Sequence, residues 1–215
     1  MTSGPLAVVL AAGAGSRFTG ACHKLLAPLD GQPVVRRAMA AAAASGLPTL
    51  VVAGAVDFTA ALVRLAKVLG YRVTVCDARE VFATTARFPF ADEVVVDWPN
   101  RLLERIGDEL GPRDAVCVLT HDHKFDVPAV VAAMRTEVGY LGAMGSRRTH
   151  AERLDRLRRE GVGDDDLARL MAPIGLDIGA RTPEETAVAV CAEIIALRTG
   201  RPAPSLREGE GPIHR

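Results

Sequence analysis

The apolar residues of the chain fall into short unbroken runs that alternate with longer stretches of helical periodicity. Because these runs are apolar throughout, they are typical of parallel strands that are covered on both faces. Strands are predicted at 6–10, 49–53, 72–76, 93–96, 115–119 and 138–141, and helices at 33–45, 57–69, 100–110, 127–135, 148–160, 164–170 and 183–197. The pattern predicts an α/β fold that is Rossmann-like, with a mostly parallel sheet and helices on both of its faces.

The pattern divides the chain into three parts. Residues 1–47 carry a strand, a Gly-rich loop and a helix, and they form an N-terminal fragment ahead of the main domain. Residues 48–200 carry the alternating strands and helices of the Rossmann-like domain. Residues 201–215 are rich in proline and glycine and are expected to be irregular. With 215 residues, 49% of them hydrophobic, the chain is long and apolar enough to bury a core.

Charge and cysteine usage narrow the class of protein. The formal net charge is +0, so neither nucleic acid nor an anionic membrane is expected as a partner. Cys22, Cys76, Cys117 and Cys191 form no C-x-x-C pair, which argues against a disulfide framework and fits a reducing compartment. No apolar run approaches the ~20 residues that span a bilayer, and the first residues lack the basic start of a signal peptide. We therefore expect a cytoplasmic protein.

Ligands of open parallel sheets bind at the carboxyl ends of the strands, so the segments after each predicted strand are candidate sites. After the first strand of the main domain, Gly54 is the only glycine, which makes a poor dinucleotide fingerprint. Asp77 ends the next strand, where an acidic residue either binds a ribose hydroxyl or caps a turn. The sequence leaves these two interpretations of Asp77 equally open.

The segment after the last predicted strand favours an anion site. Gly142 and Gly145 permit an unusual backbone, and Ser146 can cap the helix that follows. Arg147 and Arg148 add positive charge beside the backbone N–H groups of the helix start. The alternative is an ordinary glycine turn with two solvated arginines.

Two further segments are candidates for contact with a ligand. His121 and Asp122 lie in a polar segment that continues to Asp126; we favour turn and capping chemistry there over a metal site, so no metal is expected. The loop with Asp177 and Arg181 is too polar and glycine-rich for a simple linker, and it is a candidate lid over the sheet edge. The helix after it begins with a Thr-Pro-Glu-Glu capping box.

These motifs resemble the C-terminal Rossmann-like domain of the XdhC/CoxI family. The resemblance rests on residues 70–79, 119–122, 124–128, 142–150 and 173–186, and it extends over about 48–215. His123 departs from it, because the family pattern has proline there. The resemblance implies an accessory protein, usually a homodimer, that binds molybdenum cofactor (a molybdopterin). Such a protein helps to deliver the cofactor to a client molybdoenzyme of the xanthine dehydrogenase or CO dehydrogenase type. The candidate cofactor contacts are Gly54, Asp77, His121, Asp122, Gly142, Gly145, Ser146, Arg147, Arg148, Asp177 and Arg181.

The N-terminal fragment resembles a different family. Residues 10–18, 24–26 and 31–33 are similar to the start of MobA/MocA-type molybdopterin nucleotidyltransferases, so the XdhC N-terminal domain is expected to be absent. Backbone amides of a Gly-rich loop can hold the triphosphate of CTP, and nearby cations neutralise it. The residues in question are Gly13, Gly15, Ser16, Arg17 and Lys24. The downstream aspartates that hold Mg²⁺ are missing, so we do not expect nucleotide transfer by this chain alone.

Three functions follow from these observations. The first is a cofactor-binding accessory protein, which fits the motifs over most of the chain and the lack of a paired nucleophile and base; no catalytic residue is predicted. The second is a CTP- or GTP-dependent molybdopterin nucleotidyltransferase, which explains only the N-terminal loop. The third is an NAD(P)-binding oxidoreductase-like protein, which rests on fold analogy.

Overall fold

A computed structural model describes residues 28–29, 32–33, 46–120 and 122–208. The chain forms two compact units, 1–47 and 48–215. In the first unit the described residues form one antiparallel pair, β1 (Pro28–Leu29) with β2 (Gln32–Pro33). Pro33, expected in the first turn of a helix, lies in β2 instead. The predicted strand at 6–10, the rest of the predicted helix, and the loop residues Gly13, Gly15, Ser16, Arg17 and Lys24 lie outside the described residues.

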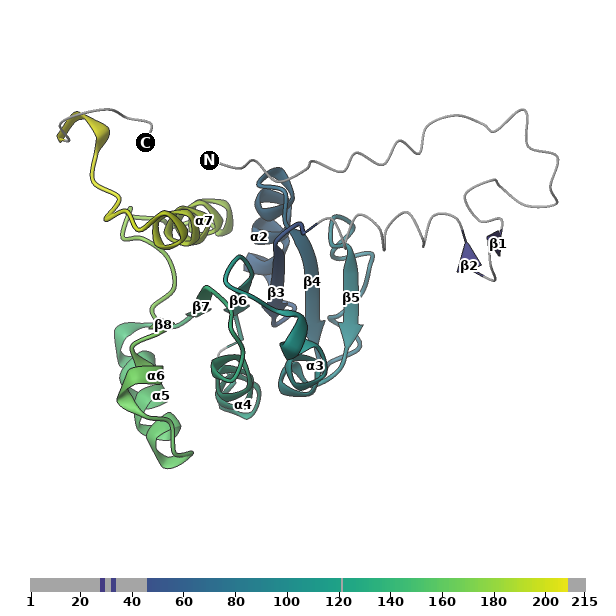
Figure 1. Ribbon diagram of the computed structural model, residues 1–215, viewed down its shortest axis with the longest axis horizontal. Helices are drawn as coiled ribbons and strands as arrows, with labels where there is room; N and C mark the ends of the chain where they lie inside the picture. Colours follow the sequence, from purple (N-terminus) through teal and green to yellow (C-terminus); the bar gives the residue numbers. More distant parts are fainter. Residues whose placement is uncertain (1–27, 30–31, 34–45, 121, 209–215) are drawn as a thin grey trace. The chain divides into compact units, whose positions relative to one another are not determined.

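The second unit is built on a six-stranded parallel sheet in the order β5-β4-β3-β6-β7-β8 (Figure 1). The strands are β3 (Thr49–Ala53), β4 (Arg72–Asp77), β5 (Glu93–Val96), β6 (Ala115–Val118), β7 (Tyr140–Ala143) and β8 (Leu170–Met171). The chain starts at the centre, runs outward to β5, returns to β6 beside β3, and then runs outward to β8. The direction reverses between β3 and β6, and open α/β sheets bind ligands at the carboxyl ends of the strands near such a reversal.

Helices cover both faces of the sheet, as the sequence predicted (Figure 1). They are α2 (Asp57–Val68), α3 (Pro99–Ile106), α4 (His123–Met134), α5 (Arg147–Arg159), α6 (Asp164–Leu167) and α7 (Pro183–Thr199), with short 3₁₀ turns at Gly107–Glu109 and Leu206–Glu208. Helices α2 and α7 pack together on one face, and α3, α4 and α5 lie on the other. Among the described residues, no helix is both long and apolar enough to cross a bilayer.

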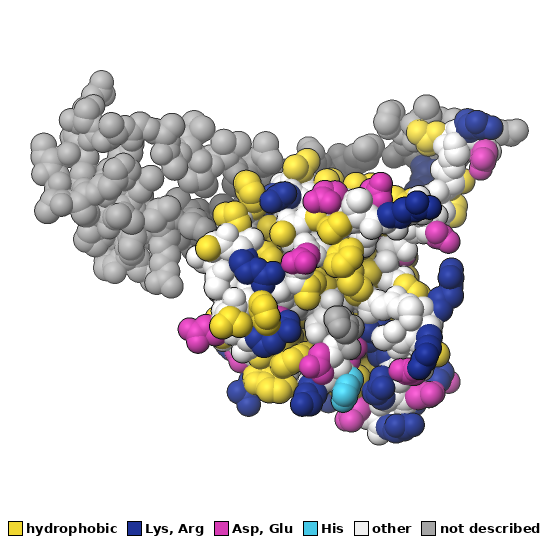
Figure 2. Space-filling model, turned by 180° about the vertical axis from the view of Figure 1, so that it is seen from behind, with side chains coloured by type: hydrophobic (Ala, Val, Ile, Leu, Met, Phe, Trp, Pro, Cys, Tyr) yellow, Lys and Arg dark blue, Asp and Glu magenta, His cyan; other side chains and the backbone are white. Residues whose placement is uncertain are grey.

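The two faces explain why the central strands β3 and β6 are apolar at nearly every position. In β3, Leu50 and Val52 belong to the hydrophobic cluster under α2 and α7, whereas Val51 and Ala53 belong to the cluster under α3, α4 and α5. Side chains of a strand alternate between faces, so a strand covered on both sides needs an apolar residue at each step. Outside the sheet, charged side chains of both signs are mixed on the surface, as one face shows in Figure 2.

Helix α4 begins at His123, four residues before its predicted start, and α3 ends at Ile106, before its predicted end at residue 110. Three further local predictions differ from the structure. Strand β7 starts and ends two residues later than expected, so Gly142 lies inside the strand and not in the loop after it. The helix expected to continue to residue 170 ends at Leu167, because Leu170 and Met171 pair with β7. Asp57, expected as an N-cap, is the first residue of α2; the Thr59 hydroxyl accepts a hydrogen bond from the Val56 N–H and donates one to the Gly54 carbonyl.

Candidate functional site

The start of α5, at the carboxyl end of β7, is a preformed helix N-terminus that faces a cavity. Ser146 is the N-cap, and its hydroxyl accepts a hydrogen bond of 3.1 Å from the Thr149 N–H. Gly145 has φ +149°, and a Cβ there would lie 3.1 Å from the Thr149 methyl carbon, so this turn needs glycine. The first turn of α5 contains no acidic residue. Its free N–H groups therefore present partial positive charge that no side chain of that turn opposes.

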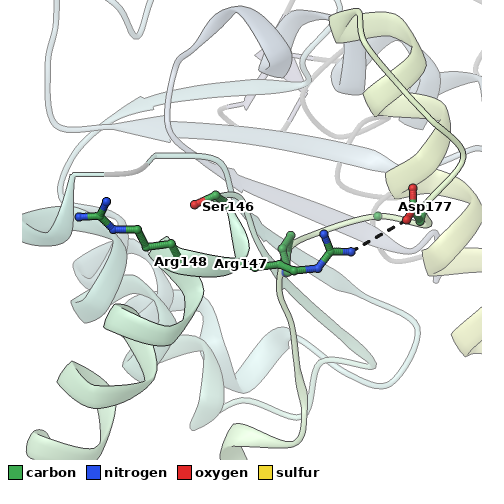
Figure 3. Close-up of a pocket in the computed structure, with 7 residues that line it drawn as sticks. Ser146, Arg147, Arg148 and Asp177 are labelled. Carbon is green, nitrogen blue, oxygen red and sulfur yellow. Dashed lines mark ion pairs between the residues drawn. The ribbon is translucent and has the colours of Figure 1, made fainter.

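The cavity beside this helix start has a volume of about 600 Å³. It is lined by Gly145, Ser146, Arg147 and Arg148 on one side and by Pro173, Gly175 and Asp177 on the other. The 173–177 loop thus forms the opposite wall, which is the position expected of a lid. In Figure 3, Arg147 points toward Asp177 and Arg148 points the other way. The Arg147–Asp177 ion pair measures 4.0 Å between side chains that are 89% and 90% exposed, so it contributes little and leaves Arg147 free to turn.

The floor of the site is held by a buried ion pair that sequence analysis missed. The Arg153 side chain is 1% exposed and that of Asp126 is 4% exposed. Arg153 Nη2 donates to Asp126 Oδ2 (3.1 Å) and to the Met144 carbonyl (2.6 Å), and Arg153 Nε donates to Asp126 Oδ2 (3.2 Å). Burial, followed by the charge of Arg153, lowers the pKa of the neighbouring His150. The pair connects the backbone before Gly145 to the first turn of α4.

The opposite wall is fixed by a carboxylate on α7. Glu193 Oε2 accepts hydrogen bonds from the Tyr140 hydroxyl (2.6 Å) and from the Gly175 N–H (2.9 Å). Burial first, and then the nearby Cys117 and Glu193, raise the pKa of Tyr140, so its hydroxyl stays a donor. Gly142 lies beneath this wall, and a Cβ on it would meet Ile174 Cδ1 at 2.6 Å. Gly142 therefore gives the loop room to pack on the sheet, and it does not line the cavity.

Two of the remaining candidates on this edge, Asp122 and Arg181, take part in helix caps. Asp122 caps α4 by accepting from the Lys124 N–H (3.0 Å), and His121 lies outside the described residues. Arg181 does not line the cavity; its backbone N–H donates to Glu185 in the capping box of α7. No group of three or more His, Cys, Asp or Glu in the described part of the chain is arranged to hold a metal ion.

Asp77 and Gly54 meet on the other side of the β3–β6 reversal. Asp77 Oδ2 accepts from the Ala55 N–H (2.8 Å) and from Arg79 Nη2 (2.7 Å), and its Oδ1 accepts from Arg79 N–H and Nε (both 2.9 Å). Burial alone would raise the pKa of the Asp77 carboxyl, but the hydrogen bonds from Arg79 and Ala55 outweigh it and lower the pKa. These bonds occupy the carboxylate, which favours the turn-capping interpretation. Gly54 has φ +116°, and a Cβ there would lie 2.8 Å from the Thr120 nitrogen.

Comparisons with known proteins identify the family of this domain. The family model described as the XdhC Rossmann domain matches residues 50–194. A protein of Bacillus subtilis (strain 168) that is named as a probable component of xanthine dehydrogenase is 34% identical over 151 residues, which cover 70% of this chain and 43% of that protein. The molybdenum cofactor insertion chaperone PaoD of Escherichia coli (strain K12) is 37% identical over 84 residues, 39% of this chain and 26% of that protein.

A solved structure is similar to this chain in both fold and sequence. A xanthine dehydrogenase from Bacillus halodurans superposes with a TM-score of 0.61 and 31% identity, over 74% of this chain and 45% of that chain. The chain therefore spans less than half the length of these relatives. The region matched by the family model begins in β3, ends in α7 and contains the whole cavity at the start of α5. By these matches, and as its motifs predicted, the chain belongs to the XdhC Rossmann domain family.

Proposed function

We propose that this protein binds a molybdopterin-type molecule and acts as an accessory protein in the maturation of a xanthine dehydrogenase- or CO dehydrogenase-type molybdoenzyme. The observation that carries the proposal is the positive start of α5, which has no acidic residue in its first turn and faces a cavity of about 600 Å³ at the carboxyl edge of the sheet. Two relatives are named for related roles, one as a probable component of xanthine dehydrogenase and one as a molybdenum cofactor insertion chaperone.

The phosphate of a molybdopterin is the group that this site is best suited to hold. Backbone N–H groups of the first turn of α5 would donate to its oxygens, and the Ser146 hydroxyl lies beside them. Arg147 can leave the weak pair with Asp177 and add a charge-assisted hydrogen bond. The buried Arg153 holds the turn from below, so the donors are in place before the ligand arrives.

Binding and transfer, without covalent catalysis, are the tasks that these side chains support. The described residues that line the cavity are glycine, serine, arginine, proline and aspartate, and this set offers Ser146 no histidine, lysine or second carboxylate to activate it. We therefore infer a carrier role, with the client enzyme as the partner that receives the cofactor. The homodimer that the family resemblance implies is part of the same proposal.

The test is retention of cofactor by the purified full chain. Protein and molybdenum cofactor are mixed anaerobically, separated by gel filtration, and the pterin in the protein peak is quantified; the elution volume reports whether the protein is a dimer. Hydrogen bonds to charged groups contribute about 1.5–3 kcal/mol each. Because both arginines are exposed, the lower end applies to the pair, and Arg147→Ala/Arg148→Ala should weaken retention about tenfold.

A matched control removes the same charge from the same helix. Arg158 and Arg159 lie at the far end of α5, away from the cavity, and Arg158→Ala/Arg159→Ala should retain cofactor like the unaltered protein. Equal loss in both double variants would show that net charge matters and the helix start does not. No retention by the unaltered protein would overturn the proposed function itself.

A further inference from the structure

A second hollow lies on the other half of the sheet edge, at the start of α2. It has a volume of about 210 Å³, and we call it the arginine pocket; it is lined by Ala55, Val56, Asp57, Arg79, Phe82 and Arg87. A neighbouring hollow of about 340 Å³ shares Val56, Asp57 and Arg87 with it and extends along α2 to Arg64. Sites for small molecules occupy about 300–1,000 Å³, so the two hollows together have the size of one.

The arginine pocket is built around one exposed aromatic ring. Phe82 is 39% exposed, although an apolar side chain of its size is usually covered. The guanidinium carbon of Arg79 lies 4.6 Å from the centroid of this ring, and that of Arg87 lies 5.5 Å from it. Both guanidinium groups are planar and both are held against the ring, so the pocket offers flat surfaces on which another planar ring can stack.

The flat surfaces are fixed in position without a ligand. The buried Asp77 holds Arg79 through two side-chain hydrogen bonds, of 2.9 and 2.7 Å. Arg87 Nη1 donates to the carbonyl groups of Ala55 (3.1 Å) and Phe82 (3.2 Å), which ties the 78–92 loop to the start of α2. A pocket whose walls are already ordered loses little entropy when a ligand enters.

The charges of the pocket favour a neutral ring over a phosphate. Arg79 and Arg87 are balanced by Asp77 and Asp57, and Asp57 occupies the first turn of α2, where it opposes an anion. The Asp57 side chain is 90% exposed, and its ion pair with Arg87, of 3.4 Å, is weak because water screens it. The Asp57 oxygens can therefore accept hydrogen bonds from a ligand. Ring N–H and amino groups are donors of the right kind.

We propose that the arginine pocket binds the planar nitrogen heterocycle of a small ligand, stacked on Phe82 and the two guanidinium groups, with a donor edge toward Asp57. This chemistry is shared by nucleobases and pterins. The proposal goes beyond the function proposed for the α5 cavity, because it uses none of that cavity's residues. Its failure would leave the first proposal intact.

The chain contains its own reporter for this pocket. Trp98 is the single tryptophan of the sequence, and its ring lies 4.9 Å from that of Phe125. Phe125 lies 6.0 Å from the guanidinium carbon of Arg79. Only Arg79 and Phe125 therefore lie between a ring bound in the pocket and the Trp98 ring. The fluorescence of Trp98 should change when the ligand binds.

The experiment titrates the full-length protein with four probes that carry no phosphate, so that none is drawn to the start of α5: cytidine, guanosine, 6-hydroxymethylpterin, and ribose, which has no ring base. Affinity is measured by calorimetry and, for the nucleosides, also by Trp98 fluorescence. Saturable binding of a ring-bearing probe and no binding of ribose is expected. Binding of nucleosides alone would identify a nucleobase, and binding of the pterin alone would identify a pterin. Binding of ribose as tight as that of cytidine, or a Kd above about 1 mM for every ring-bearing probe, would overturn the proposal.

Two variants test the location. Stacking of a base on an aromatic side chain contributes about 1–3 kcal/mol, so Phe82→Ala should raise Kd about tenfold. Val81→Ala is the control, since Val81 is an exposed apolar residue of the same loop that lines neither hollow, and it should leave Kd unchanged. Asp57→Asn changes an exposed side chain and should also weaken binding without affecting the fold. Unchanged affinity in both Phe82→Ala and Asp57→Asn would place the ring elsewhere and refute the proposal.

Discussion

Single residues in this domain have uses that their position in the sequence does not reveal. Helix α5 is rich in arginine, and Arg153 is buried while Arg147 and Arg148 are exposed. The sequence pointed to Arg147 and Arg148 as candidate anion contacts, and it gave Arg153 no special place. The site was predictable where local rules act, at the Ser146 cap and the glycine before it, because capping depends on a few adjacent residues. Arg153 was not predictable, since its partner Asp126 lies 27 residues away.

The buried ion pair under the cavity gives a prediction about stability. Removal of one partner of a buried pair costs about 3–5 kcal/mol, because the other charge stays buried alone, whereas an apolar replacement of both is often neutral. Arg153→Met should therefore lower the free energy of unfolding by about that amount in urea denaturation, and Arg153→Met/Asp126→Leu should recover most of it. A double variant no more stable than the single one would contradict this.

The same two variants separate positioning from stability. Both lack the hydrogen bond of Arg153 to the Met144 carbonyl, which holds the backbone before Gly145. Retention of cofactor should therefore stay low in the double variant even where the free energy of unfolding is restored. If retention recovers together with stability, Arg153 supports the fold only.

At the scale of elements, the strands were easier to predict than their ends. Continuous apolar runs identified β3, β4, β5 and β6 almost to the residue, because most of their positions face one of two hydrophobic clusters. Strand β8 was missed, since two residues carry no periodicity and it forms only by pairing with β7. The arginine pocket was also missed, because Phe82 and Arg87 lie on a loop that folds back onto α2.

Substitution of Gly142 in strand β7 should disturb the packing of the 173–177 loop on the sheet. A methyl group there would lie 2.6 Å from Ile174 Cδ1 and 2.7 Å from the Tyr140 hydroxyl, closer than packed atoms allow. Gly142→Ala should lower the free energy of unfolding by about 1–3 kcal/mol and displace the 173–177 wall, with a parallel loss of cofactor retention. Gly111→Ala is the control, because its nearest neighbour would be 3.9 Å away. Equal effects of the two substitutions would exclude a packing role for Gly142.

The whole molecule consists of two units. The second is the Rossmann-like domain, and the first is an N-terminal fragment whose sequence resembles a different family, the MobA/MocA-type nucleotidyltransferases. The sheet, both hydrophobic clusters and both pockets of the second unit use residues from 48 onward. Strand β3 lies at the centre of that sheet, although it is the first strand of the unit along the chain. Its two neighbours, β4 and β6, come later in the sequence, so both strands that pair with β3 belong to the second unit.

The second unit is therefore expected to fold without the fragment. A chain of residues 48–215 should be monodisperse, with a thermal midpoint within about 5 °C of that of the full chain. In a domain of this length, a shift of that size corresponds to a loss of only about 1–2 kcal/mol of stability. Circular dichroism melting measures the midpoint, and the gel-filtration assay then shows which unit holds the cofactor. Full retention by 48–215 would assign binding to the second unit, and the Arg147→Ala/Arg148→Ala variant of that chain would then test the α5 cavity. A stable 48–215 chain that retains no cofactor would move the binding site to residues 1–47. An aggregated or unfolded 48–215 chain would show that the two units depend on each other, contrary to the independence that the sheet implies.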